Sequence, residues 1–286
     1  MGHLNVAFYV AKSMEGLGGL AAELGMPGAF GPATASTLVV REQHIRFLRE
    51  ARPGAPLSMT AGVVSMDETA ARVLLLMRHA SGELAATFNT LVTHVTSGEA
   101  RPFAWSDRVR ARADALKIEI PDQARARSIR LEPVDTQASL ARAIALGMTR
   151  TGLRMIATAD CDAFGRMRTE IMMHRLSDGV PHILSARRDP ATQPPGRVGG
   201  AVLEYRLIHH AWPRAGDRVE LRSGFAGGDS RIRRLIHWMV DPETGAPWGS
   251  AEAIAISLDL ETRKIITLSD EDVARTGAEA IAGLGL

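Results

Sequence analysis

The spacing of apolar residues predicts two helices, each followed by a series of strands. An apolar residue at every third or fourth position predicts one helix over residues 3–15, and the same spacing recurs from Met167 to Asp178. The β-rich runs are residues 36–51, 57–64, 70–79 and 84–95 after the first helix, and residues 198–212, 218–226, 231–240 and 250–258 after the second. One helix followed by four strands therefore occurs twice.

Turn residues recur at a nearly constant offset between the two parts of the chain. Gly165 lies 163 positions after Gly2 (165 − 2), and Gly216 lies 162 positions after Gly54 (216 − 54). One insertion and one deletion in loops, where length changes are tolerated, would produce this small drift. We interpret the pattern as a tandem duplication. Each copy is expected to be α+β, with a central helix wrapped by a curved antiparallel sheet.

These elements divide the chain into four parts. They are a first copy (residues 1–96), an Arg-rich linker (97–150), a second copy (151–268) and a C-terminal tail (269–286). The linker is expected to contain a helix over residues 134–149, and the tail a short helix that frays. A strand over residues 153–158 leads into the second helix. The first copy begins directly with its helix, so we expect its leading strand to be missing.

Composition and charge indicate a soluble globular protein. The chain has 286 residues, of which 45% are hydrophobic, which is enough to bury two cores. No apolar run approaches the roughly 18 residues that span a bilayer, and no secretory leader is recognisable. A net charge of +2 gives no reason to expect a nucleic-acid partner. The single cysteine, Cys161, suits a reducing compartment, so we expect a cytoplasmic protein.

Arginine is concentrated in the linker, at positions 101, 108, 110, 112, 125, 127 and 130. Such a run is commonly a solvated face. The alternative is a docking surface for an anionic carrier such as the phosphates of coenzyme A. The sequence leaves both interpretations open.

Two short segments resemble a known motif. Gly2-His3-Leu4-Asn5, with Tyr9 after it, resembles the Gly-His-Met-Asn-Asn-x-x-Tyr motif of hotdog-fold acyl-thioester hydrolases. The segment Asp162-Ala163-Phe164-Gly165-Arg166-Met167 resembles the Asp-x-x-Gly-His-Met form of that motif. Apart from the linker and tail, the chain resembles a double-hotdog thioesterase of the 4-hydroxybenzoyl-CoA or long-chain acyl-CoA type.

The resemblance implies a tandem hotdog fold and hydrolysis of an acyl-CoA or acyl-carrier-protein thioester to the acid and the thiol. It implies no cofactor and no metal, and it allows a homodimer of double-hotdog chains. Two other functions remain open: a hotdog hydratase or dehydratase, and a non-catalytic acyl-CoA-binding protein.

The two copies of the motif have lost different residues. The first keeps His3 and Asn5, but an aspartate at the motif position would precede Gly2 by three residues. The second keeps the aspartate but has Arg166 and Arg168 where the family usually has His and Asn. We therefore expect either a composite site or a single surviving one, with Arg166 and Arg168 binding the carrier part of the substrate.

Asp162 is the main catalytic candidate. We expect it, with Gly165, at a turn directly before the second helix, whose first N–H groups lack intrahelical partners and can hold an oxyanion. In the family, a carboxylate here attacks the thioester carbon or activates water. The alternative is that Asp162 only caps the helix.

Four further residues are site candidates. Glu15 and Asp178 each precede a glycine, so we expect both at helix C-termini, where an acid opposes the helix dipole. They could supply a catalytic carboxylate, or they could be solvated helix ends. His3 and Asn5 could bind the thioester carbonyl or position water, or they could serve local turn chemistry. Cys161 could act as a nucleophile, but its flanking aspartates would raise the thiol pKa. We therefore expect Cys161 to be a buried small residue.

Overall fold

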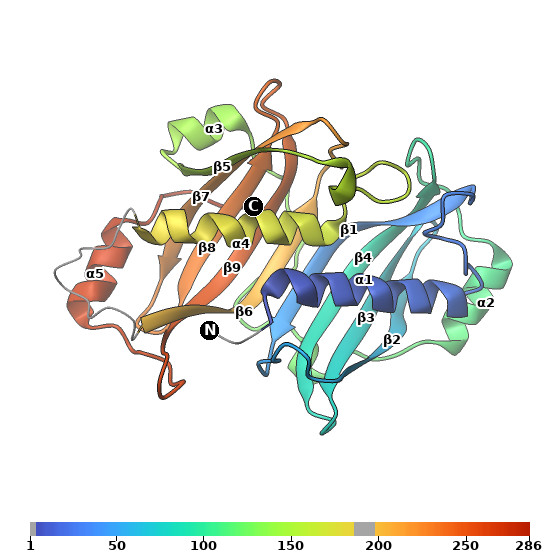
Figure 1. The fold of residues 1–286 in the computed structure, drawn as a ribbon, viewed down its shortest axis with the longest axis horizontal. Coiled ribbons are helices and arrows are strands. Elements are labelled where there is room, and N and C mark those ends of the chain that lie inside the picture. Colours follow the sequence, from blue (N-terminus) through green and yellow to red (C-terminus); the bar gives the residue numbers. More distant parts are fainter. Residues whose placement is uncertain (1–3, 186–197) are drawn as a thin grey trace. The chain divides into compact units, whose positions relative to one another are not determined.

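Both predicted copies are present in the structure, a computed structural model that describes residues 4–185 and 198–286. The first repeat comprises α1 (Val6–Glu23), β1 (Ser36–Phe47), β2 (Leu57–Met66), β3 (Ala70–His79) and β4 (Leu84–Thr96). The second repeat comprises β5 (Thr149–Met155), α4 (Thr169–Ser185), β6 (Val198–His209), β7 (Arg218–Gly228), β8 (Arg233–Val240) and β9 (Pro247–Asp259) (Figure 1). The predicted order of one helix and four strands is confirmed in each copy.

The strands of each repeat form an antiparallel sheet. The strand order is β2-β3-β4-β1 in the first repeat and β6-β9-β8-β7-β5 in the second. The chain divides into two compact units. Unit 1 contains residues 1–126, 156–174 and 212–216, and unit 2 contains residues 127–155, 175–211 and 217–286. The turn that leads into α4 therefore belongs to the same unit as the first repeat.

The duplication extends to irregularities in the sheets. α4 begins 163 positions after α1 (169 − 6). The pairing of β1 with β4 shifts register between Val40 and Glu42, and that of β6 with β9 shifts between Val202 and Glu204, 162 positions later (202 − 40). A bulge bends a strand at a defined point. Bulges at matching positions therefore give the two sheets the same local bend.

Glycines that align in the sequence have matching backbone conformations. Gly54 and Gly216 have φ angles of 82° and 95°, and Gly82 and Gly245 have φ angles of 85° and 75°. This left-handed region suits glycine because a Cβ would be strained there. These two turns therefore have the same conformation in both repeats.

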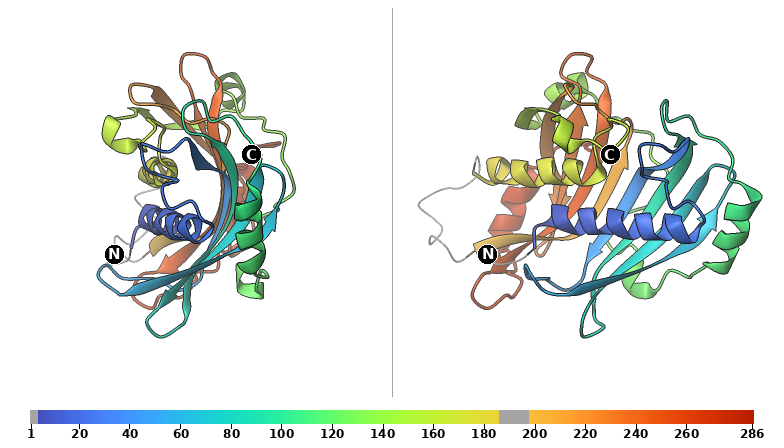
Figure 2. Two further views of the ribbon diagram at one scale, coloured as in Figure 1. Left: turned by 90° about the vertical axis from the view of Figure 1, so that its right-hand side faces the viewer. Right: turned by 45° about the vertical axis from the view of Figure 1, so that its right-hand side comes forward.

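α1 is longer than predicted, because it runs to Glu23 instead of ending near residue 15. Gly16, expected to end the helix, lies inside it, and a Cβ there would come within 2.8 Å of the side chains of Leu75 and Met59. Glycine at this position lets the helix approach the sheet closely. Figure 2 shows the sheet of the first repeat curving around α1.

Among the described residues, no strand precedes α1, whereas β5 precedes α4 and pairs with β7. In the first repeat, linker residues after α2 (Asp107–Ala115) lie beside β2 instead. Val63 N–H donates to Leu116 O (2.9 Å), and Ile118 N–H donates to Val63 O (3.0 Å). The linker therefore covers part of the sheet edge that the sequence analysis left open.

The face of each sheet that turns away from its helix is here called the outer face. On the first repeat it is covered at Gly62, where a Cβ would lie 2.7 Å from Ile118 of the linker. On the second it is covered at Gly224, where a Cβ would lie 2.7 Å from Ile281 of the tail. The predicted tail helix is present as α5 (Asp270–Ala278). After this helix, Leu284 is buried against the sheet.

Two other predictions need correction. The linker helix expected over residues 134–149 is confined to α3 (Leu140–Ala145), with Ser139 as its N-cap and Gly147 following at a φ of 68°. The strand before α4 ends at Met155 instead of residue 158, because a short 3₁₀ helix (Thr158–Asp160) follows it. A second 3₁₀ helix, Asp122–Ala124, lies in the linker. No helix within the described ranges is long and apolar enough to cross a membrane.

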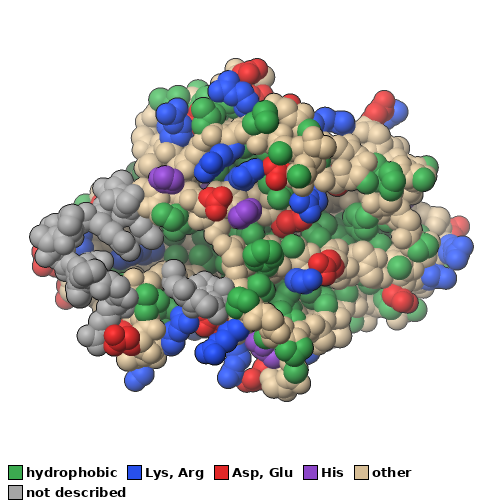
Figure 3. Space-filling model, in the orientation of Figure 1, with side chains coloured by type: hydrophobic (Ala, Val, Ile, Leu, Met, Phe, Trp, Pro, Cys, Tyr) green, Lys and Arg blue, Asp and Glu red, His purple; other side chains and the backbone are tan. Residues whose placement is uncertain are grey.

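Two linker arginines bind backbone carbonyls in the structure. Arg110 donates to the carbonyl oxygens of Asp67 (3.3 Å) and Glu68 (3.2 Å), and Arg112 donates to that of Glu23 (3.0 Å). These bonds fasten α2 to the first repeat. Acidic and basic side chains are interspersed on the face that carries α1 (Figure 3). Docking of carrier phosphates on the linker stays a prediction.

Candidate functional site

Residues 161–167 form a small hairpin in front of α4. Asp162 N–H donates to Arg166 O (2.7 Å), Gly165 N–H donates to Asp162 O (3.1 Å), and Cys161 forms a β-bridge with Met167. Gly165 has a φ of 75°, which suits glycine. The tight turn predicted at Asp162 and Gly165 is therefore present.

The Asp162 carboxylate accepts three hydrogen bonds from its own hairpin. Oδ1 accepts the N–H of Phe164 (2.8 Å) and of Arg166 (3.0 Å), and Oδ2 accepts Arg166 Nε (3.2 Å). A carboxylate offers about four acceptor sites. One site therefore remains, on Oδ2, and the side chain is 33% exposed. Asp162 can hold one further donor, such as a water molecule.

Asp162 is not at a helix N-terminus, so that expectation was wrong. α4 begins at Thr169, seven residues later (169 − 162). The physical reason is that the Asp162 side chain bonds the N–H groups of its own turn, which closes the hairpin before the helix can start.

Arg166 is almost fully buried beside Asp162. Its side chain is 4% exposed, its Nε bonds Asp162 Oδ2, and its guanidinium lies 4.8 Å from the centre of the Phe164 ring. Nη1 and Nη2 are buried and have no hydrogen-bond partner among the residues that the structure describes. The sequence marked Arg166 as a departure from the motif, but only the structure shows that it is buried.

Arg168 is the more exposed of the two arginines. Its Nη2 donates to Ala159 O (2.9 Å), and its Nη1 forms an ion pair with Glu170 Oε1 at 3.0 Å. These contacts join the short 3₁₀ helix to the first turn of α4. Binding of the substrate's carrier by Arg168 stays a prediction.

Equivalent backbone hydrogen bonds hold the residues before α1 and before α4. Met167 N–H donates to Pro213 O (2.8 Å), and Leu4 N–H donates to Ala51 O (2.8 Å). Both pairs lie within unit 1. A second bond holds the hairpin, because Gly216 N–H donates to Ile156 O (2.9 Å). The turn is thus anchored on the loop between β6 and β7.

Of the first motif copy, only the end can be described. Gly2 and His3 lie outside the described residues. Asn5 is the N-cap of α1, and its side chain accepts the N–H of Ala7 at 2.9 Å. This is the local turn chemistry that we weighed against a role in the site. Whether His3 and Asn5 contact substrate stays a prediction.

Glu15 and Asp178 are not at helix C-termini, so that part of the prediction was wrong. α1 continues to Glu23 and α4 to Ser185, because the glycines after both acids pack inside the helices. A Cβ on Gly179 would lie 3.0 Å from the Thr151 hydroxyl. Glu15 is 66% exposed and paired with Lys12 at 2.9 Å, and Asp178 is also exposed. A catalytic role for either acid stays a prediction.

Cys161 is partly buried. Burial raises its thiol pKa, and the neighbouring Asp160 and Asp162 raise it further, which disfavours the nucleophilic thiolate.

No group of three or more His, Cys, Asp or Glu side chains within residues 4–185 and 198–286 could hold a metal ion.

A buried network of polar side chains in the second repeat was not predicted from the sequence. Ser223 Oγ lies 3.3 Å from Thr151 Oγ1 and 2.8 Å from His237 Nδ1, and Tyr205 OH lies 3.5 Å from His237 Nε2. Burial lowers the His237 pKa to about 4 and raises that of Tyr205. A histidine among apolar residues of β8 was the available signal. Because this network of polar side chains is buried in the core, we assign it a structural role.

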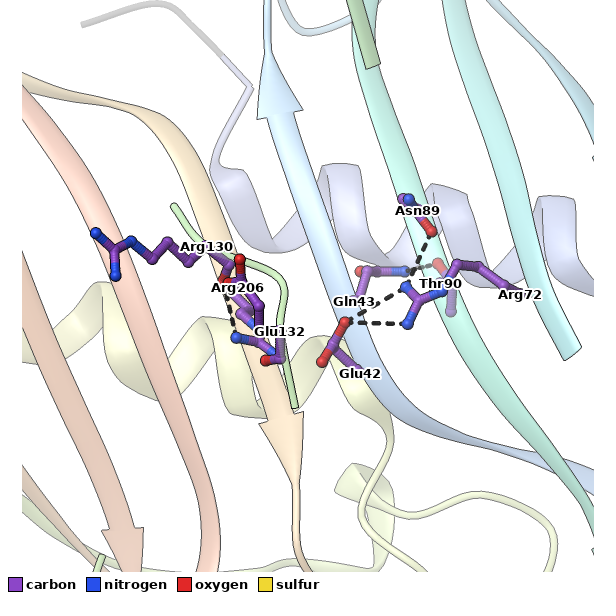
Figure 4. Close-up of polar contacts among 8 residues, drawn as sticks. All are labelled: Glu42, Gln43, Arg72, Asn89, Thr90, Arg130, Glu132 and Arg206. Carbon is purple, nitrogen blue, oxygen red and sulfur yellow. Dashed lines mark hydrogen bonds and ion pairs between the residues drawn. The ribbon is translucent and has the colours of Figure 1, made fainter. Parts of the chain in front are cut away.

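The corresponding part of the first repeat has a simpler buried network. Gln43 Nε2 donates to Ser13 Oγ (3.1 Å) and to Thr90 Oγ1 (3.0 Å), beneath α1. On the outer face, Arg72 lies 3.4 Å from Glu42 and 3.1 Å from Asn89 (Figure 4). These contacts are distinct from the Asp162 hairpin.

Comparison with known proteins supports the fold. The family model of the thioesterase-like superfamily matches residues 1–113. A protein described as an oleoyl thioesterase, from Lactobacillus plantarum, has a TM-score of 0.66 at 12% identity, covering 94% of this chain and 91% of that one. The 12:0-ACP thioesterase from Umbellularia californica has a TM-score of 0.64 at 13% identity, with 89% and 87% covered.

An acyl-ACP thioesterase from Bacteroides thetaiotaomicron is also similar, with a TM-score of 0.58, 12% identity and coverage of 89% and 90%. No curated protein sequence matches the chain. At these identities, structural likeness shows the fold alone. The chain as a whole therefore has the tandem hotdog fold expected from its sequence, and the thioesterase-like family model matches its first repeat and the start of the linker.

Proposed function

We propose that this protein hydrolyses an acyl thioester of coenzyme A or of an acyl carrier protein, with Asp162 as the reacting carboxylate. The observation that supports this most is the Asp162 hairpin. It keeps the Asp-x-x-Gly form of the thioesterase motif directly before the central helix of a hotdog repeat. The match of residues 1–113 to the thioesterase-like superfamily supports the same reaction.

The geometry around Asp162 fits a general base. With three acceptor sites filled, the remaining site on Oδ2 can hold one water molecule. The water oxygen bonds to the thioester carbon while Asp162 takes its proton. The oxyanion then collapses, the carbon–sulfur bond breaks, and the departing thiolate receives that proton. Thioester and water thus give acid and thiol.

Two rival functions differ from this one by simple observations. A hotdog hydratase would need a histidine placed to act with the aspartate, whereas the described side chain paired with Asp162 is Arg166. A non-catalytic acyl-CoA-binding protein would bind the same ligands and release no thiol. The carboxylate with a free acceptor site favours hydrolysis over both.

The test is thiol release from a panel of acyl-CoA and acyl-carrier-protein substrates of increasing chain length, followed with a thiol reagent. The carrier-protein substrates are included because two of the similar structures are named acyl-ACP thioesterases. Catalytic release of thiol from at least one substrate is the expected result. Binding of acyl-CoA without thiol release would replace hydrolysis by the function of a non-catalytic acyl-CoA-binding protein.

A cytoplasmic location and a homodimer belong to the same proposal. Light scattering would measure the oligomeric state.

A further inference from the structure

The Arg166 guanidinium is held firmly along one part of its surface. Its Nε is bonded to Asp162 Oδ2 at 3.2 Å, and the Phe164 ring lies against it at 4.8 Å. Arg166 N–H is bonded to Asp162 Oδ1 at 3.0 Å, so the backbone is held as well. With 4% of the side chain exposed, the guanidinium has little freedom to turn. Its remaining donors therefore have a fixed position.

Those remaining donors are unused. Nη1 and Nη2 are buried and lack a hydrogen-bond partner among the described residues. A buried charged donor left without an acceptor is strongly destabilising, so native proteins rarely keep one without a use. Arg168, in the same turn, differs because both of its Nη atoms have acceptors. Of the two arginines in this turn, only Arg166 thus has buried donors without an acceptor among the described residues.

We propose that the Nη groups of Arg166 bind the carbonyl oxygen of the substrate's thioester, stabilise the oxyanion formed from it, and then hold the product carboxylate. This inference rests on the proposed thioesterase function and adds a second catalytic residue to it. Arginine suits the task because its planar fork matches a carboxylate and its charge does not titrate near neutral pH.

The hydrogen bond between Arg166 Nε and Asp162 Oδ2 places the oxyanion donor next to the general base. Nε and one Nη donate along the same edge of the planar guanidinium, and Nε is already bonded to Asp162 Oδ2. An oxygen bound at that Nη would lie beside the carboxylate oxygen that holds the attacking water. A preorganised donor of this kind acts where negative charge develops in the transition state. The hairpin therefore brings a base and an oxyanion donor together within five residues (162 to 166).

The experiment compares Arg166→Ala and Arg166→Lys with Arg154→Gln, at an exposed arginine of β5, as the matched control. Loss of one oxyanion donor typically lowers kcat about a hundredfold to a thousandfold. We expect that loss for Arg166→Ala, partial recovery with millimolar guanidinium ion but not with sodium at equal ionic strength, and a change of under about threefold for Arg154→Gln. Lysine keeps the charge without the fork, so Arg166→Lys should fall in between.

A second measurement does not depend on turnover. Binding of decanoate, as a product-like carboxylate, is measured by calorimetry on the wild type and on both Arg166 variants. We expect binding at least tenfold weaker in the variants. Circular dichroism and thermal melting show whether each variant is folded. If both variants unfold, arginine nitrogen NMR of the wild type replaces them, and new slowly exchanging Nη–H signals with decanoate are expected.

The outcomes separate this inference from the proposed function. If no substrate releases thiol but decanoate binding depends on Arg166, hydrolysis fails and the anion site stands. If thiol is released and folded Arg166→Ala matches the wild type in kcat and decanoate affinity, hydrolysis stands and the Arg166 proposal is overturned. Absence of new Nη–H signals in the NMR experiment would overturn it too.

Discussion

The two repeats share a backbone plan but bury different polar side chains beneath their helices. His237, Ser223 and Tyr205 of the second repeat correspond to Leu75, Ala61 and Gln43 of the first, each 162 positions earlier (237 − 75). The pairing of Ser223 with His237 repeats that of Ala61 with Leu75. A sheet fixes which face a residue points to, but not its chemistry. The duplicated fold therefore left room for the repeats to diverge.

The residues directly before each central helix, here called the lead-in of that helix, differ in the same way. In the first repeat a neutral residue, Asn5, caps α1. In the second, an ion pair joins Asp162 to Arg166, and Arg168 links the short 3₁₀ helix to the first turn of α4 by a hydrogen bond and an ion pair. Equivalent positions thus have a cap in one repeat and a charged cluster in the other. The comparison predicts that chemistry is concentrated at the second lead-in.

The largest expected effect tests that concentration. Asp162→Asn keeps the Oδ1 acceptor for two N–H groups but removes the charge, so kcat should fall by about a hundredfold or more. Glu15→Gln, on the exposed face of α1, should leave kcat unchanged. Thiol release measures both. The opposite result would move the reaction to the helix acid and away from Asp162.

Asp162→Asn has a second consequence that the structure adds. The change leaves Arg166 buried without its carboxylate, and breaking a buried ion pair typically costs about 3–5 kcal/mol. Because Asp162 is one-third exposed, solvent screening reduces this loss, and we expect about 1–2 kcal/mol. Urea denaturation measures it. Activity lost in step with folded protein would speak for structure alone.

The next effect concerns pH. His237 is buried with its pKa lowered to about 4 from an ordinary 6.5, so between these values the unfolded chain binds more protons than the folded one. Stability is therefore full above pH 6.5 and is lost as the pH falls toward 4, by about 3 kcal/mol at 1.36 kcal/mol per pKa unit.

Exchanging the repeats' residues isolates that effect. The double variant Ser223→Ala/His237→Leu introduces the side chains of Ala61 and Leu75 and removes the titrating group. Denaturation at pH 7.5 and pH 4.5 should show a smaller difference for the variant than for the wild type. An equal difference in both would assign the acid sensitivity to other groups.

A smaller effect compares the outer faces. Gly62→Ala and Gly224→Ala both place a Cβ 2.7 Å from an isoleucine side chain, Ile118 of the linker or Ile281 of the tail. Overpacking typically costs about 1–3 kcal/mol. Urea denaturation should show similar losses for both variants. Gly19→Ala, with open space around its Cβ and a helical backbone, is the control and should be neutral or stabilising.

The smallest effect is at the first lead-in. Asn5→Ala removes the N-cap of α1 and should cost about 1 kcal/mol without changing kcat. Thermal melting and thiol release measure the two quantities. A large fall in kcat at nearly unchanged stability would place Asn5 in the reacting site and make that site composite.

The sequence was sufficient for the duplication, the order of helices and strands, and the turn at Asp162 and Gly165. These depend on local rules, namely hydrophobic periodicity and the backbone freedom of glycine. It led to a wrong helix end at Gly16, because this glycine serves packing: its missing Cβ lets α1 approach Leu75. It also placed Asp162 too close to α4, because hairpin closure depends on which N–H groups the carboxylate accepts.

Local pattern therefore determined the elements and their repetition, whereas tertiary packing determined which polar groups are buried and what they contact. Arg166 and Arg168 are two residues apart and chemically identical, and no sequence rule separates them. In the structure one is 4% exposed with unused donors, and the other is 43% exposed with its donors bonded. Burial is a property of everything packed around a side chain, so only the folded chain decides it.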